Sequence, residues 1–105
     1  MQNLRPAGKK YTLVGTGETS KQIATSGGII VRGVIVTGAS TAALVRIIDS
    51  RNGSGEVGPG PQNYTVAANA GESTVSPIQH VMEQGLYIEL EQGLNTPAEA
   101  TIFYD

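Results

Sequence analysis

The stretch that decides the fold is GGIIVRGVIVTG, from Gly27 to Gly38, followed by TAALVRIIDS, from Thr41 to Ser50. Ile and Val fill both runs, and β-branched side chains pack well on a pleated sheet but lose rotamer freedom in a helix. The dipeptide Ala39-Ser40 separates the runs directly after a glycine. The sequence therefore predicts two strands, and the short connection favours a β-hairpin.

Both predicted strands carry apolar residues on both faces. One face of a strand packs on the core, so a second apolar face needs a partner or lies exposed, unless a sandwich buries both. Gly33, in the middle of the first strand, indicates a bulge or the close approach of another backbone. The two arginines of the second faces are expected to meet or flank each other. With strict alternation, the second faces consist of Ile30, Arg32, Val34, Leu44, Arg46 and Ile48.

Further extended segments follow the same reasoning. Leu86, Ile88 and Leu90 alternate with polar neighbours, and the last segment is apolar enough to lie inside a sheet. Residues 76–84 are ambiguous, because Ser76-Pro77 resembles a helix start while the alternation that follows favours a strand; the extended form is preferred. The other expected segments are Tyr11–Val14, a weak edge strand at Gln22–Thr25, Tyr64–Ala68, a stretch beginning at Glu72–Val75, and Ala100–Tyr104.

The organisation predicted from these segments is one all-β domain. The chain has 105 residues, the size of a single domain. Residues 1–10 lack periodicity and are expected to form an N-terminal arm, and residues 11–105 a single domain with a Gly- and Pro-rich loop from Asp49 to Gln62. About seven to eight short strands with turns between them predict an antiparallel β-sandwich, of jelly-roll or immunoglobulin-like type.

Composition argues against several classes of function. The formal net charge is −2 and 15% of residues are charged, so no clustered basic surface for nucleic acid is expected. No apolar run reaches the length of a signal peptide or a membrane span. The absence of Cys removes disulfides and thiolate metal sites. The sequence predicts a chain made as a soluble intracellular protein, with neither nucleic acid nor membrane as a partner.

Each motif for catalysis or ligand binding that the sequence matches lacks a part that the chemistry requires. Residues 53–58 match G-x-G-x-x-G, but Pro59-Gly60-Pro61 follows and forbids the helix that holds a pyrophosphate. His80 and Glu83 would give two metal ligands where three or four are needed. Glu89 and Glu91 share one face of a strand and are expected to be solvated. We therefore predict no catalytic, cofactor-binding or metal-binding residues, and a chain that is not an enzyme.

Six segments follow one another over roughly Gln22 to Asp105: GGIIVRGVIVT, TAALVRIIDS, a Gly-rich loop, ESTVSPIQ, GLYIELEQG and PAEATIFYD. This set of strands resembles small all-β structural proteins of tailed bacteriophages. The resemblance implies a virion component made in the host cytoplasm, most simply a capsid decoration (cement) protein that binds the shell as a homo-oligomer. A subunit of the neck, tail or a fibre is the alternative within this class.

The resemblance and the second apolar faces together give an interface hypothesis. Ile30, Arg32, Val34, Leu44, Arg46 and Ile48 are expected near a contact between copies of a dimer or trimer. The loop Arg51–Gln62 or the arm Met1–Lys10 is expected to touch the major capsid protein or another virion protein. A carbohydrate-binding β-sandwich that stacks a sugar on Tyr87 is the alternative of another class.

Overall fold

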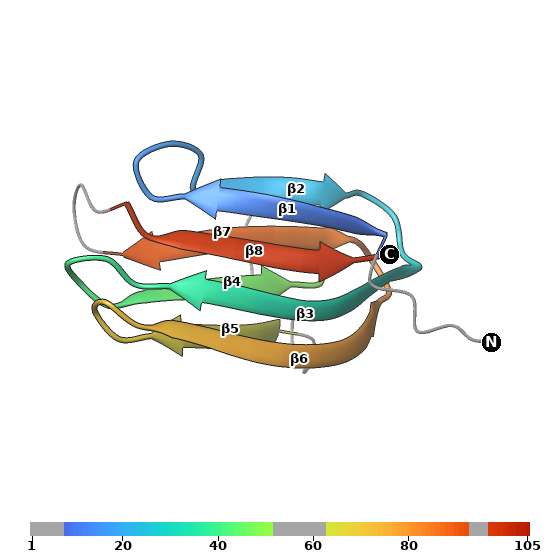
Figure 1. Ribbon diagram of the computed structural model, residues 1–105. Helices are drawn as coiled ribbons and strands as arrows, with labels where there is room; N and C mark the ends of the chain where they lie inside the picture. The colour runs from blue at the N-terminus through green and yellow to red at the C-terminus, as the bar shows by residue number, and fades with distance from the viewer. Residues whose placement is uncertain (1–7, 52–62, 93–96) are drawn as a thin grey trace.

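The fold consists of two four-stranded antiparallel sheets packed face to face (Figure 1). The computed structural model describes residues 8–51, 63–92 and 97–105. Sheet A has the strand order β1-β8-β3-β6 and sheet B the order β2-β7-β4-β5. The strands are β1 (Lys9–Val14), β2 (Ser20–Ala24), β3 (Ile29–Thr37), β4 (Ala43–Ile48), β5 (Asn63–Ala68), β6 (Ser73–Met82), β7 (Leu86–Gln92) and β8 (Glu99–Tyr104).

The pairing of the strands defines a jelly roll. Strand β4 pairs with β5, β3 with β6, β2 with β7 and β1 with β8, all antiparallel. This is one long hairpin, β1–β4 against β5–β8, folded over into two sheets. The additional pairs β3–β8 and β4–β7 join its halves within each sheet. The predicted all-β sandwich is confirmed, and its strand order is that of a jelly roll rather than an immunoglobulin domain.

The core lies between the sheets and is built by alternation along each strand. Leu86, Ile88 and Leu90 point inward from β7 as expected, while Tyr87 and Glu89 on the other face are half-buried. Fully burying one such aliphatic side chain contributes roughly 1.5–3 kcal/mol. The largest side chains that are almost completely buried are Leu13, Val31, Val34, Val36, Val45, Ile47, Ile48, Met82, Leu86, Ile88 and Ile102.

The predicted hairpin between β3 and β4 is wrong, because these strands belong to different sheets. The connection between them packs against the β5–β6 turn instead. Gly38 N–H donates to Glu72 O (2.9 Å), and Gly71 N–H donates to Ala39 O (2.8 Å). A Cβ atom at Gly38 would lie 2.3 Å from Asn69 O, so the two turns touch closely. The chain therefore crosses from sheet A to sheet B at this point.

Strand β3 contains the predicted bulge. Its register against both β6 and β8 shifts between Val31 and Gly33. A bulge adds one residue on one strand only, so the inward and outward positions exchange beyond it. Val31 and Val34 are consequently both buried, and Ile35 is on the outer side.

The structure corrects the start of the first strand and decides between helix and strand for most of residues 76–84. Strand β1 begins at Lys9, and Lys9 and Lys10 pair with Tyr104 and Phe103, so these lysines belong to the sheet and not to an arm. Residues 76–82 are extended within β6, as preferred. Pro77 lies in this edge strand, the position in a sheet where a residue without N–H is tolerated. Residues 1–7 and most of the predicted loop, 52–62, lie outside the described residues.

Candidate functional site

The outer faces of the two sheets differ in chemistry. On sheet B, Arg46 forms ion pairs with Glu89 (3.6 Å) and Glu91, so this face carries charged side chains that pair with one another. On sheet A, the corresponding face carries Phe103 and Ile35, together with the side chains of β6. Val75 in β6 is 69% exposed. The outer face of sheet A is therefore the apolar one, and it is the candidate site.

Register brings the apolar residues of sheet A side by side. Gly33 pairs with Phe103 on one side and with Pro77 on the other. Ile35, two residues further along β3, pairs with Val75. Because Gly33 has no side chain, the row that contains it has a gap between a benzyl ring and a proline ring. The bulge of β3 thus produces a depression at the centre of the sheet.

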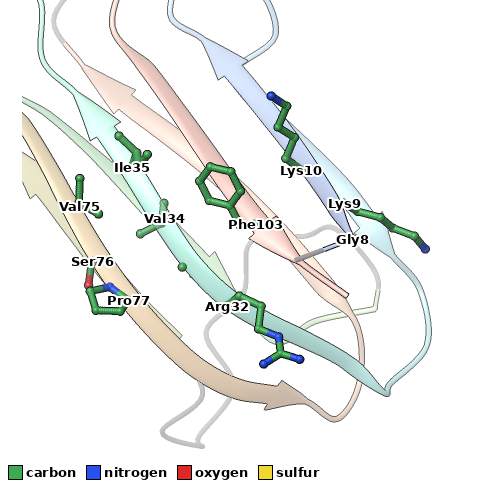
Figure 2. Close-up of a pocket in the computed structure, with 11 residues that line it drawn as sticks. Gly8, Lys9, Lys10, Arg32, Val34, Ile35, Val75, Ser76, Pro77 and Phe103 are labelled. Atoms are coloured by element: carbon green, nitrogen blue, oxygen red, sulfur yellow. The ribbon is translucent and has the colours of Figure 1, made fainter. Parts of the chain in front are cut away.

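We call this depression the sheet A hollow. It has a volume of about 610 Å³ and is open to solvent. Figure 2 shows Phe103 between Lys10 on β1 and the residues of β3, with Val75 and Pro77 on the far side. A Cβ atom at Gly33 would lie 3.3 Å from Ser76 O, so glycine keeps the floor of the hollow low. The hollow is lined by Gly8, Lys9, Lys10, Arg32, Gly33, Val34, Ile35, Val75, Ser76, Pro77 and Phe103.

The rim of the hollow is cationic at one end. Lys9 and Lys10 are exposed, and among the described residues neither forms an ion pair. Arg32 Nε donates to Asp105 Oδ2 at 2.9 Å, and Gly8 N–H donates to Asp105 Oδ1 at 2.5 Å. The side chains of these four residues, Lys9, Lys10, Arg32 and Asp105, carry a formal charge of +2. This is opposite in sign to the whole chain, at −2.

Hydroxyl groups border the hollow at the other end. Thr12 Oγ1 and Thr101 Oγ1 are 2.9 Å apart across β1 and β8, and Thr37 Oγ1 and Ser73 Oγ are 2.9 Å apart across β3 and β6. These groups satisfy each other across the strands. The apolar surface is therefore bounded by polar groups that already have partners at one end, and by lysines without ion pairs at the other.

The six residues of the interface hypothesis do not share one face. Val34 and Ile48 are each 1% exposed, so they are buried inside the chain and are not available to a partner, which corrects the expectation. The bulge explains the error at Val34, because it shifts the alternation by one position. The remaining four separate by sheet: Ile30 and Arg32 lie in β3 of sheet A, and Leu44 and Arg46 in β4 of sheet B.

The expectation that the two arginines flank each other is therefore wrong. Arg32 pairs with Asp105, and Arg46 with Glu89 and Glu91, on opposite sides of the sandwich. Sequence reasoning also missed Phe103 and Val75 as members of the candidate site. The pairing that brings Phe103 beside Gly33 and Val75 beside Ile35 joins strands that are far apart in the sequence, so it cannot be read from the local pattern of residues.

His80, which was weighed as a metal ligand, packs against another side chain of the sandwich. His80 is half-buried: its Nδ1 lies 2.9 Å from the Tyr64 hydroxyl, and the two rings meet edge to face with centroids 5.1 Å apart. Because β6 is extended, His80 and Glu83 do not have the helical spacing of a ligand pair. Among the described residues, no group of three or more His, Asp or Glu side chains is arranged to hold a metal ion.

The other candidates are also accounted for. Glu89 and Glu91 both form ion pairs with Arg46. Tyr87 is half-buried on the outer face of sheet B, and its hydroxyl donates to Glu89 Oε2 at 3.4 Å. The G-x-G-x-x-G match at residues 53–58 lies outside the described residues.

Comparisons with known proteins add no family to these observations. Within the described ranges, no helix has the length and apolar character needed to cross a membrane. Searches against family models, curated proteins and solved structures found no match.

Proposed function

We propose that this chain is a non-enzymatic structural protein of a virion, most simply a capsid decoration protein that binds the shell. The observation that carries the proposal is the apolar outer face of sheet A. The sandwich already has a complete core between its sheets, so Val75, Ile35 and Phe103 are not needed there. A contiguous apolar surface outside the core is typical of a protein–protein contact. The resemblance of the strand set to phage structural proteins gives the class of partner.

The fold is compatible with this role. Jelly rolls occur in viral capsid proteins and also in lectins, so fold alone does not assign function. The edges of sheet A favour a contact through its face. Pro77 interrupts the donors of β6, and Lys9 and Lys10 lie along β1, two devices that discourage strand addition. The partner is therefore expected to cover the sheet and not to extend it.

The proposal includes association of copies as a dimer or trimer. Several weak contacts made by one oligomer bind a repetitive shell far more firmly than a single contact, because each later contact is intramolecular. A subunit of the neck, tail or a fibre would use the same apolar face. These positions differ from decoration in the number of copies per particle.

The test is to purify particles from the source of the sequence and count this chain by quantitative mass spectrometry. Copies in proportion to the major shell protein would support decoration. A small fixed number per particle would support the neck, tail or fibre alternative. Absence from particles would reject the virion proposal, and a glycan screen with wild type and Tyr87→Ala would then test the carbohydrate-binding alternative.

A further inference from the structure

The strongest unassigned feature is the sheet A hollow, and its walls restrict what can occupy it. Phe103, Ile35, Val75 and Pro77 offer an apolar lining around the floor at Gly33. Such a lining favours aliphatic or aromatic side chains over polar ones. The volume of about 610 Å³ is within the range of ligand sites in proteins.

The shape argues for a macromolecular segment. Small-molecule sites bury most of the surface of their ligand in a cleft or cavity. The hollow is instead a shallow depression on the face of a sheet, open to solvent along the strands. A segment of protein chain can lie across such a surface and insert one or two side chains. The hollow therefore fits an anchor residue of a partner better than an enclosed ligand.

The charge of the rim selects among partner segments. Lys10 pairs in register with Phe103, so the two residues lie side by side on β1 and β8, and both line the hollow. Among the described residues, Lys9 and Lys10 have no carboxylate partner, and the four charged side chains of the rim carry a formal charge of +2. Complementary charge at the rim of a contact speeds association and rejects wrong partners. A carboxylate beside the inserted apolar side chain would meet this requirement.

The same charge disfavours two other occupants. A symmetric contact between two copies through this face would bring the lysine ends together as like charges. The segment that precedes Gly8 in the sequence, MQNLRPA, carries Arg5 and no acidic residue, so it does not complement the rim either. The experiment below includes a readout for the second copy.

We propose that the sheet A hollow binds an extended, acidic and apolar segment of another protein, with an apolar side chain seated over Gly33 and a neighbouring carboxylate paired with Lys10. The inference rests on the proposed function for the identity of that protein as a virion component. The segment lies on the face of the sheet and does not add a strand to it, because Pro77 interrupts the edge of β6.

The experiment is a titration of the isotope-labelled full chain, followed by the backbone amide signals of each residue. The probe is a short capped peptide that alternates Leu and Glu, and the control peptide replaces each Glu by Lys. We expect the acidic peptide to shift the signals of Gly33, Ile35 and Phe103, with affinity that falls as salt is added. Equal shifts with the basic peptide, or shifts elsewhere on the chain, would overturn the proposal.

Two variants with matched controls test the lining and the rim separately. Val75→Glu is expected to weaken peptide binding roughly tenfold by placing a charge in the lining. Val81→Glu is the control, since Val81 is exposed on the same strand but does not line the hollow. Lys10→Glu is expected to weaken binding about two- to fivefold, as for loss of an exposed ion pair, and Lys21→Glu is its control. If the control variants bound the peptide as weakly as the test variants, the assignment of the lining and the rim would be contradicted.

Two further outcomes count against the proposal. If dodecanoate, a small amphiphilic carboxylate, bound the hollow more tightly than the peptide, the hollow would be a small-molecule site. Concentration-dependent shifts of the same signals without peptide would mean that a second copy occupies the hollow. Failure here is distinct from failure of the virion proposal: a chain present in particles but indifferent to the peptide would bind its shell through another surface.

Discussion

At the scale of single residues, the chain uses its carboxylates to hold backbone. Asp49 Oδ1 accepts hydrogen bonds from Gln84 N–H (2.7 Å) and Gly85 N–H (3.1 Å), and its Oδ2 accepts one from Glu83 N–H (2.9 Å). These three donors form the turn between β6 and β7. A Cβ atom at Gly85 would lie 2.6 Å from Ser50 O, so the turn also packs tightly on the end of β4. Asp49 therefore holds the backbone of this turn in place.

Asp49→Asn is expected to destabilise the fold by about 1–3 kcal/mol. The amide replaces one acceptor oxygen by a donor, which cannot bond the turn N–H groups that the oxygen faced. The free energy of unfolding, measured in urea, checks this. Glu83→Gln is the control, because Glu83 is exposed and undergoes the same carboxylate-to-amide change. A stability loss as large in the control would contradict the role of Asp49.

Tyr11 provides a test of pH dependence. Its hydroxyl donates a hydrogen bond to the Glu18 carboxylate, and this bond raises the pKa of Tyr11 above the ordinary value of 10.0, with partial desolvation and the negative charge of Glu18 acting in the same direction. A raised pKa in the folded state means that the neutral phenol is the form stabilised by folding. Its contribution is therefore complete below pH 10 and is lost as the pH rises through the folded-state pKa.

Tyr11→Phe removes this hydroxyl. We expect the variant to be less stable than wild type at neutral pH, and the difference to shrink toward strongly alkaline pH. Denaturant unfolding of both chains across the range from neutral to about pH 11 measures it. A difference that stays constant through the alkaline range would show that the Tyr11–Glu18 hydrogen bond does not stabilise the folded chain.

At the scale of elements, β3 determines both the core and the candidate site. Its bulge lets Val31 and Val34 face inward while Arg32 is exposed. Without the bulge, β3 would have two regular faces. With it, Val31 and Val34 both close the core, and a depression forms on the outer face at Gly33. The apolar content and glycine of this stretch predicted the strand and its irregularity, but not the direction in which each side chain points after it.

The bulge can be tested with two neighbouring substitutions of β3. Val34→Glu is expected to abolish folding, because an unpaired buried charge costs several kcal/mol out of a total stability of about 5–15 kcal/mol. Ile35→Glu is expected to leave a folded chain, since this side chain is on the outer face. Thermal unfolding followed by circular dichroism distinguishes them. A folded Val34→Glu chain would place Val34 outside the core.

Sequence reasoning succeeded where the signal is local and failed where it is not. Alternation grouped Leu86, Ile88 and Leu90 on one face, and all three are buried, because period two is a property of each strand alone. The β3–β4 hairpin was wrong, because turn-forming residues permit a crossover as readily as a hairpin. The candidate site was predicted only in part: Arg32, one of the six residues of the interface hypothesis, lies at the rim of the hollow, but the depression itself depends on pairing between β3, β6 and β8.

At the scale of the whole molecule, β8 is the strand on which sheet A depends. It lies between β1 and β3, and Lys9 pairs with Tyr104 across almost the full length of the chain. Sheets built from such distant partners close large loops, and folding is then slow, in the range of milliseconds to seconds. Both the stability and the rate of folding are set by this long-range pairing.

A chain that ends at Gln92 is expected to be unfolded. It lacks Ile102 and Ala100 from the core and separates β1 from β3. The dispersion of its amide proton signals measures this. Adding a synthetic peptide that spans residues 97–105 is expected to restore the native spectrum by completing the sheet. A well-dispersed spectrum of the truncated chain alone would show that sheet A does not require β8.

The central position of β8 also has a consequence for synthesis on the ribosome. Domains generally fold as units, and in a longer chain the N-terminal domains fold first during synthesis. Here β1 and β3 are made early, yet the strand that joins them leaves the exit tunnel after all seven others. Until β8 is in place, β1 and β3 each expose an unpaired edge on which strands of other nascent chains can assemble. Sheet A can therefore be completed only after Tyr104 has been translated. The yield of folded protein is expected to fall as the local concentration of nascent chains rises.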